Sequence, residues 1–130
     1  MPSPNPTEGE LAILRVLWNR SGPTTVREVH EVLSQTKDTA YTTVLKMLTI
    51  MADKGLVRRD ESERSHTYEA VHEKPVVQGS LLRDLMQRAF GGSALELVQR
   101  ALDNDTASAE DLEAISRLIA QARAAKRKQA

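Results

Sequence analysis

Apolar and polar side chains in residues 40–57 recur with a helical period, and the segment then becomes extended. Its apolar positions follow the i, i+3, i+4, i+7 spacing of one helix face: Tyr41, Val44, Leu45, Leu48 and Ala52. The opposite face is rich in hydroxyls: Thr42, Lys46, Thr49 and Asp53. Lys54 and Gly55 predict the helix end, because a cation suits the last turn and glycine readily adopts the left-handed conformation after it. We predict a helix with one core face and one face open to a partner.

Two helices are predicted before this one and a hairpin after it. Each of the two begins with a capping box, a Thr followed by a Glu three residues later: Thr7 with Glu10, and Thr25 with Glu28. These boxes predict helices over about 7–19 and 25–35, and Thr39 is expected to cap the third helix. Residues 56–60 and 67–71 alternate as strands do, with a polar turn between them.

This order predicts a mainly α fold with a small β-hairpin, a winged helix-turn-helix over residues 7–73 that follows a flexible N-terminus at 1–6. A generic small α+β domain, in which the hairpin merely covers the core, is the alternative.

Residues 74–130 are predicted to be helical, with breaks at Gly91-Gly92 and at 103–105. Ser93 and Ser108 are expected to cap the second and third of these helices. Short amphipathic helices cannot bury their apolar stripes alone. We therefore predict a helical dimerisation region with a basic C-terminal tail, with these contact residues: Leu82, Leu85, Leu112, Ile115 and Ile119. The alternative is that the helices fold back onto the same monomer.

Composition excludes several kinds of site. The 130 residues include no cysteine, so disulfides, thiolate metal sites and Cys nucleophiles are excluded. The sequence carries neither a signal-peptide pattern nor an apolar stretch of membrane-spanning length, and we expect no membrane insertion and a cytoplasmic location. Zinc-protease histidine spacing, a phosphate-binding glycine loop and a nucleophile elbow are absent. We expect no enzyme activity, no cofactor and no metal site.

The charge balance limits a nucleic-acid interpretation. The chain has 18 Lys or Arg and 18 Asp or Glu, and residues 1–73 alone hold 9 against 11. Affinity for phosphates depends largely on cations. Only local clustering of basic side chains could therefore create a DNA-binding surface.

Five segments occur in an order and spacing that is specific as a set, although each is common alone. They are residues 8–14 with Leu17 and Trp18, then 25–29, 40–44, 53–57 and 68–71. On these segments, over about 70 residues, the chain resembles the BlaI/MecI family of bacterial penicillinase repressors, which act in antibiotic resistance. From residue 75 onward the resemblance is to the helical pattern only.

The resemblance implies a homodimeric transcriptional repressor whose third helix enters the major groove of a pseudo-palindromic, double-stranded DNA operator. The resemblance implies that these residues read the bases: Ala40, Tyr41, Thr42, Thr43 and Lys46. Thr39, just before them, is also expected to contact DNA. By its spacing Tyr41 belongs to the apolar stripe that faces the core, so we expect its ring to pack inward. Its only expected contact with DNA is a hydrogen bond from the hydroxyl to a phosphate.

Two further sets of residues are candidates for DNA contacts. Thr24 and Thr25 at a helix N-terminus suit a phosphate, and helix capping is the alternative for both. Arg64, with Ser65 and His66, is the predicted wing tip, because a guanidinium on a loop can enter the minor groove or hold a phosphate.

The resemblance also concerns regulation. In this family a membrane sensor-protease system relieves repression through a cut in the C-terminal helices, typically at an Asn-Phe bond, and Arg100-Ala101 aligns there in this chain. Relatives that respond to copper carry C-terminal cysteines, which this chain lacks. Two other functions stay open: a ligand-sensing winged-helix repressor with a pocket beside helix 81–90, and a winged helix that binds only protein.

Overall fold

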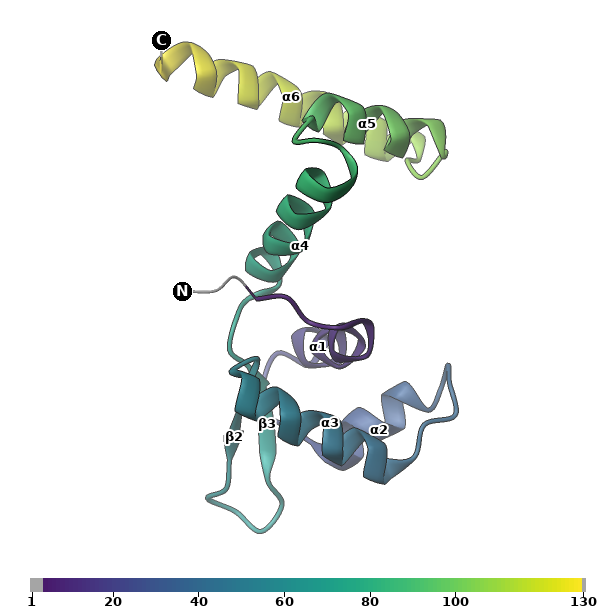
Figure 1. The fold of residues 1–130 in the computed structure, drawn as a ribbon, viewed down its shortest axis with the longest axis vertical. Coiled ribbons are helices and arrows are strands. Elements are labelled where there is room, and N and C mark those ends of the chain that lie inside the picture. The colour runs from purple at the N-terminus through teal and green to yellow at the C-terminus, as the bar shows by residue number, and fades with distance from the viewer. Residues whose placement is uncertain (1–3, 130) are drawn as a thin grey trace. The chain divides into compact units, whose positions relative to one another are not determined.

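The computed structural model describes residues 4–129, and Figure 1 shows the order of its elements. They are α1 (Glu8–Arg20), β1 (Thr24–Thr25), α2 (Val26–Leu33), α3 (Tyr41–Lys54), β2 (Val57–Asp60), β3 (Thr67–Ala70), α4 (Lys74–Ala89), α5 (Ala94–Asp103) and α6 (Ala109–Gln129). The chain forms two compact units, Met1–Arg83 and Asp84–Ala130. The domain boundary predicted at residues 73 and 74 coincides with the start of α4 and stays a prediction.

Both predicted capping boxes are present. In α1 the Thr7 hydroxyl accepts from the Glu10 amide at 3.2 Å, and the Glu10 carboxylate accepts from the Thr7 amide at 2.9 Å. Thr25 and Glu28 repeat this pair at the start of α2. These reciprocal bonds satisfy amides that a helix start leaves without a partner, which explains why both helices begin where the sequence predicts.

The predicted cap of α3 is wrong. Ala40, not Thr39, is the N-cap residue, and it makes no side-chain capping bond. The Thr39 hydroxyl instead donates to the Lys37 carbonyl at 3.1 Å, within the turn that precedes the helix. The other end of α3 is as predicted, because Gly55 adopts the left-handed conformation with φ of 81°.

The sheet has three antiparallel strands in the order β1-β3-β2. The hairpin of β2 and β3 confirms the two predicted strands. Strand β2 begins one residue later than predicted, and strand β3 ends one residue earlier. Strand β1 was not predicted, because a strand of two residues shows no period. Tyr68 of β3 lies between Thr24 of β1 and Arg59 of β2, so the hairpin is attached to the segment that enters α2.

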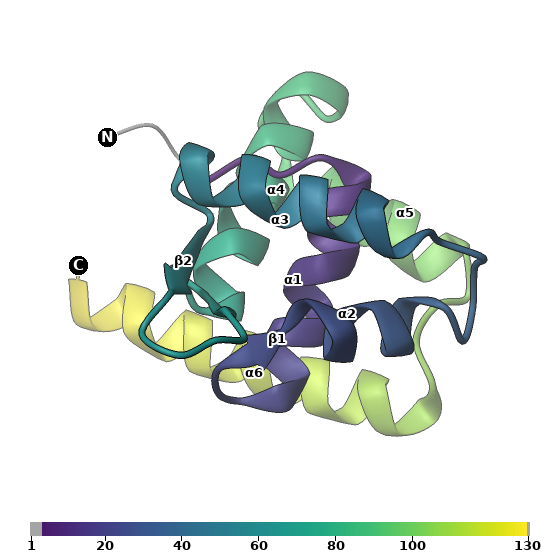
Figure 2. The same ribbon diagram turned by 90° about the horizontal axis from the view of Figure 1, so that it is seen from below.

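The core lies between α1, α2, α3 and the sheet. Its most buried side chains come from all four: Ile13, Leu14, Val29, Val44, Leu48, Met51 and Tyr68. Both views show α2 and α3 side by side (Figures 1 and 2). Burial of these apolar side chains is the main stabilising contribution. The fold is the predicted mainly α winged helix with a small sheet.

Tertiary hydrogen bonds fasten the end of the sheet and the first turns of α4 to the first unit. Trp18 Nε1 donates to the His72 carbonyl at 3.0 Å. Ser80 Oγ donates to the Pro4 carbonyl at 2.7 Å, and Val77 is 1% exposed. The first turns of α4 therefore pack with the winged helix.

The second unit leaves its apolar side chains largely open to solvent. Ser93 and Ser108 accept from the amides of Glu96 and Asp111, as the predicted caps require. Within residues 4–129, α5 and α6 contain no buried residue. Of the predicted dimer contacts, Ile115 is half-buried, and four are at least 45% exposed: Leu82, Leu85, Leu112 and Ile119.

Candidate nucleic-acid interface

The outward face of α3 carries the polar side chains that its pattern predicts. Val44, Leu48 and Met51 are fully buried against the core, so the opposite side of the helix faces outward. Exposed residues at the helix start and on that side include the predicted reading set: Ala40, Tyr41, Thr42, Thr43 and Lys46. The N-terminal half of α3 therefore presents a short surface with hydroxyls and a lysine.

An open hollow of about 510 Å³ adjoins the first half of α3. The start of α2, the hairpin loop and β3 supply its other walls. It is lined by Thr25, Val26, Arg27, Tyr41, Leu45, Arg64, Ser65, His66 and Tyr68. Residues from three separate segments of the chain thus meet at one place, and the predicted wing tip residues and Tyr41 are among them.

The charged side chains of the hollow are Arg27 and Arg64, both of them exposed. His66 lies on the same wall as Arg64. A chain with no net charge therefore still gathers cations where α3, α2 and the hairpin loop meet. Arg27 was not among the residues predicted to contact DNA. Its signal was a cation in the first turn of a Thr-capped helix, a position suited to a phosphate because backbone amides point outward there.

The expected inward packing of Tyr41 is wrong. Its side chain is 45% exposed, and that of Leu45 is 41% exposed. Tyr41 lies against His30 of α2, with ring centroids 5.7 Å apart and an interplanar angle of 72°. The arc of α3 that faces the core is centred on Val44, Leu48 and Met51, which turns Tyr41 toward the hollow.

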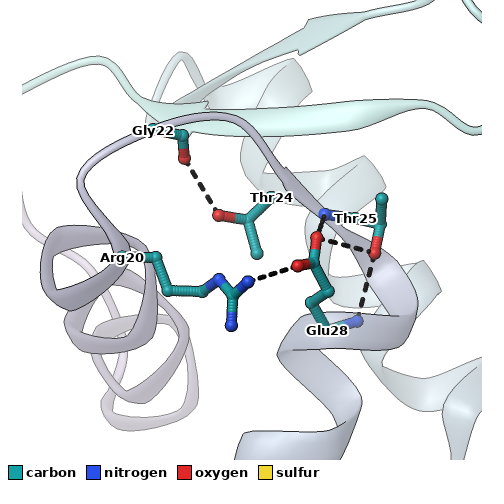
Figure 3. Close-up of polar contacts among 5 residues, drawn as sticks. All are labelled: Arg20, Gly22, Thr24, Thr25 and Glu28. Carbon is teal, nitrogen blue, oxygen red and sulfur yellow. Dashed lines mark hydrogen bonds and ion pairs between the residues drawn. The ribbon is translucent and has the colours of Figure 1, made fainter.

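Thr24 and Thr25 have structural roles (Figure 3). Thr24 is 0% exposed, and its hydroxyl donates to the Gly22 carbonyl at 2.9 Å, so the predicted phosphate contact by this side chain is wrong. The Thr25 hydroxyl bonds Glu28, which also pairs with Arg20. Hydrogen bonds from the Thr25 amide and hydroxyl hold the pKa of Glu28 below its usual value.

The two arginines of β2 lie on opposite faces of the hairpin, since side chains alternate along a strand. Arg59 is paired with the buried Tyr68 and therefore shares its face. Contact with the Tyr68 hydroxyl and the nearby Glu61 carboxylate, 2.7 Å from Arg59 Nε, raises the pKa of Arg59 above its usual value. Arg58 points to the other face, away from the hollow.

The chain matches known proteins over most of its length. The family described as "Penicillinase repressor" matches residues 6–121. The chain is 35% identical over 113 residues to proteins named "Transcriptional regulator BlaI" from two Mycobacterium tuberculosis strains, and the match covers 86% of this chain and 80% of those relatives.

Among solved structures of lower sequence identity, one shares the fold. H. salinarum RosR aligns with a TM-score of 0.50 and 16% identity, covering 95% of this chain and 99% of that one. The Bacillus licheniformis BlaI monomeric form, solved in complex with the blaP half-operator, gives a TM-score of 0.49 and 24% identity, covering 58% of this chain and 90% of that one.

In residues 4–129 no helix is long and apolar enough to cross a membrane.

Proposed function

Because the chain belongs to the penicillinase repressor family, we propose that it represses transcription by binding an operator in double-stranded DNA through α3 and the hairpin loop. The observation that carries this proposal is the hollow where Arg27, Arg64 and Tyr41 meet beside the polar face of α3. The proposal gives the chain no catalytic role and places its action in the cytoplasm, with the DNA.

The polar face of α3 is suited to the major groove. Hydroxyls of Thr42 and Thr43 can donate to or accept from base edges, and their methyl groups can touch thymine. Lys46, one turn further along, can reach a guanine or a phosphate. Leu45, exposed at the edge of the hollow, adds an apolar surface of the kind that contacts a thymine methyl.

The hollow is suited to the DNA backbone and the adjacent groove. Arg27 projects from the first turn of α2, and Arg64 from the hairpin loop. Guanidinium groups bind phosphate oxygens with two parallel hydrogen bonds, and an arginine on a loop can also enter a narrow minor groove. In this arrangement Arg27, Arg64 and Ser65 position the protein, whereas α3 distinguishes the bases.

Two copies of the chain are required for tight binding in this proposal. The exposed apolar side chains of the C-terminal helices, with Leu112 and Ile119 on one face of α6, form the contact between copies. Each winged helix then reads one half-site, and the half-sites lie about one turn of DNA apart. Since each copy has no net charge, modest single-site affinity is multiplied by the second site.

Relief of repression by a sensor-protease system is part of the same proposal. Arg100 and Ala101 are exposed on α5, within the predicted dimerisation region. Cleavage of the bond between them would separate α6 from the DNA-binding unit, and the dimer would dissociate. A protease needs extended backbone, so the last turn of α5 must unwind before the bond is cut.

A mobility-shift titration against salt tests the function. The duplex is first selected by the protein from a random-sequence library, and a scrambled duplex of the same length is the control. A DNA-binding repressor gives a negative slope of log affinity against log salt and prefers the selected duplex. The double variant Thr43→Ala, Lys46→Ala should lose that preference with unchanged helical content. A wild-type chain that enriches no duplex and shows no slope would instead be a winged helix that binds protein.

A further inference from the structure

The start of α3 is held by a side chain from another helix. Ala40, its N-cap residue, offers no side-chain capping bond. His30 of α2 does not cap the free amides of the helix, but it holds the residue before the N-cap, with its Nε2 2.7 Å from the Thr39 carbonyl oxygen. A carbonyl oxygen can only accept a hydrogen bond, so Nε2 must carry the proton in this contact. The turn that leads into α3 is therefore pinned to α2.

The same imidazole also contacts the first residue of α3. Its ring meets that of Tyr41 edge to face, at 5.7 Å and 72°, an arrangement that aromatic quadrupoles favour. His30 is half-buried, whereas Tyr41 is 45% exposed and lines the hollow. One side chain of α2 thus fixes both the backbone before α3 and the orientation of Tyr41.

We propose that His30 is a positioning residue for DNA reading, which sets the entry of α3 and the direction of Tyr41 without touching DNA itself. The proposal rests on the proposed function, because it assumes that α3 reads the operator. Helix starts fray when their amides are poorly held, and the first turn of α3 carries Thr42 and Thr43. Base discrimination depends on where these hydroxyls lie, so their position requires an external support.

Hydrogen exchange tests the support without any DNA. The amides of Thr43 and Val44 bond the Ala40 carbonyl at 3.1 and 3.2 Å, so they report opening of the first turn. His30→Phe keeps an aromatic edge for Tyr41 but removes the donor to Thr39. Losing one hydrogen bond of this kind should speed exchange at both amides roughly 2- to 12-fold. Glu31→Gln, an exposed neighbour on α2, is the matched control. Unchanged exchange in His30→Phe would overturn the proposal.

Binding to two duplexes then separates positioning from a general structural role. The probes are a duplex selected by the wild-type protein from a random library and a scrambled duplex of equal length. His30→Phe should bind the selected duplex roughly 3- to 10-fold more weakly and the scrambled duplex as before. His30→Gln, which restores an N–H donor, should recover part of the loss.

Together, the exchange and binding experiments distinguish a failure of the proposed role of His30 from a failure of the proposed function. Wild-type affinity of His30→Phe for the selected duplex, or an equal loss on both duplexes, refutes the positioning role while the proposed function stands. A wild-type protein that selects no duplex refutes the proposed function, and with it the role in DNA reading. The exchange rates report in that case whether His30 still supports the start of α3.

Discussion

Lys54, in the last turn of α3, places its Nζ 2.8 and 3.0 Å from the two carboxylate oxygens of Glu10 near the start of α1. Glu10 is 4% exposed and also accepts from the Thr7 amide in the capping box. One carboxylate therefore connects the start of α1 with the end of α3. Because both helices pack on the same core, this pair helps to hold α3 rigidly in place.

The stability of this pair should depend on pH. Burial raises the pKa of Glu10, but hydrogen bonds from Lys54 and Thr7 and the charge of Lys54 outweigh it, so the pKa lies below the usual 4.5. A lowered carboxyl pKa contributes stability that is complete above the unfolded value and is lost as pH falls through the folded value. Lys54→Ala should cost about 1 kcal/mol at neutral pH, since Lys54 is half exposed, and less at about pH 3.

Urea unfolding of both proteins at the two pH values measures this difference. Glu10→Gln is the control, because glutamine can keep the capping box while it removes the titrating group. Lys54→Ala should cost little in the Glu10→Gln background. Equal costs at neutral and acidic pH would contradict the assignment.

Tyr41→Ala should affect DNA binding more than folding. A large buried aromatic residue costs about 3–5 kcal/mol of stability when cut to alanine, but Tyr41 is 45% exposed, so we expect a loss under about 1 kcal/mol. Affinity for the selected duplex should fall roughly fivefold or more, because the ring lines the hollow. Tyr68→Ala, at a residue only 1% exposed, is the matched buried control and should destabilise strongly. A large loss of stability in Tyr41→Ala would instead mean that the Tyr41 side chain contributes to the core.

Arg27→Ala and Arg64→Ala should each reduce the steepness of the salt dependence by about one unit of slope, if each guanidinium contacts one phosphate. The effect should be similar for selected and scrambled duplexes, because phosphate contacts carry no sequence information. Arg58→Ala removes the same charge from the face of the hairpin that points away from the hollow, so its slope should match the wild type. An equal change in Arg58→Ala would mean that net charge alone matters.

Leu112→Asp with Ile119→Asp should produce monomers. Both side chains are 47% exposed on one face of α6, and a buried unpaired carboxylate would oppose their contact with a second copy. Sedimentation velocity measures the change in mass. Gln121→Asp, on the opposite face of α6 by helical spacing, should remain dimeric. A dimer that persists in the double variant would place the interface elsewhere, for example on Leu82 and Leu85 of α4.

Local patterns were enough to predict most elements of the fold. The capping boxes at Thr7 and Thr25 involve residues three positions apart, and the turn at Gly55 needs only one residue with positive φ. Such features depend on neighbours in the chain, so the sequence shows them directly. The same holds for the polar face of α3, where Thr42 and Lys46 are exposed as predicted.

Contacts between distant segments decided the rest. Thr24 is buried because β3 pairs with it across 44 positions of sequence, Thr24 to Tyr68, and no local pattern signals that pairing. Helical spacing alone placed Tyr41 in the core stripe. In the structure that edge of α3 borders the open hollow, and Met51 takes part in the core instead.

By itself the sequence determined the capping boxes that start α1 and α2, the glycine that ends α3 and the polar face of α3, because these properties follow from side chains a few positions apart. Only the tertiary structure decided how α3 is rotated against the core, that Arg27 joins Arg64 at one hollow, and that His30 holds the entry to α3. The physical reason is that rotation and juxtaposition depend on which surfaces the other elements leave uncovered, and those surfaces exist only once the core has packed.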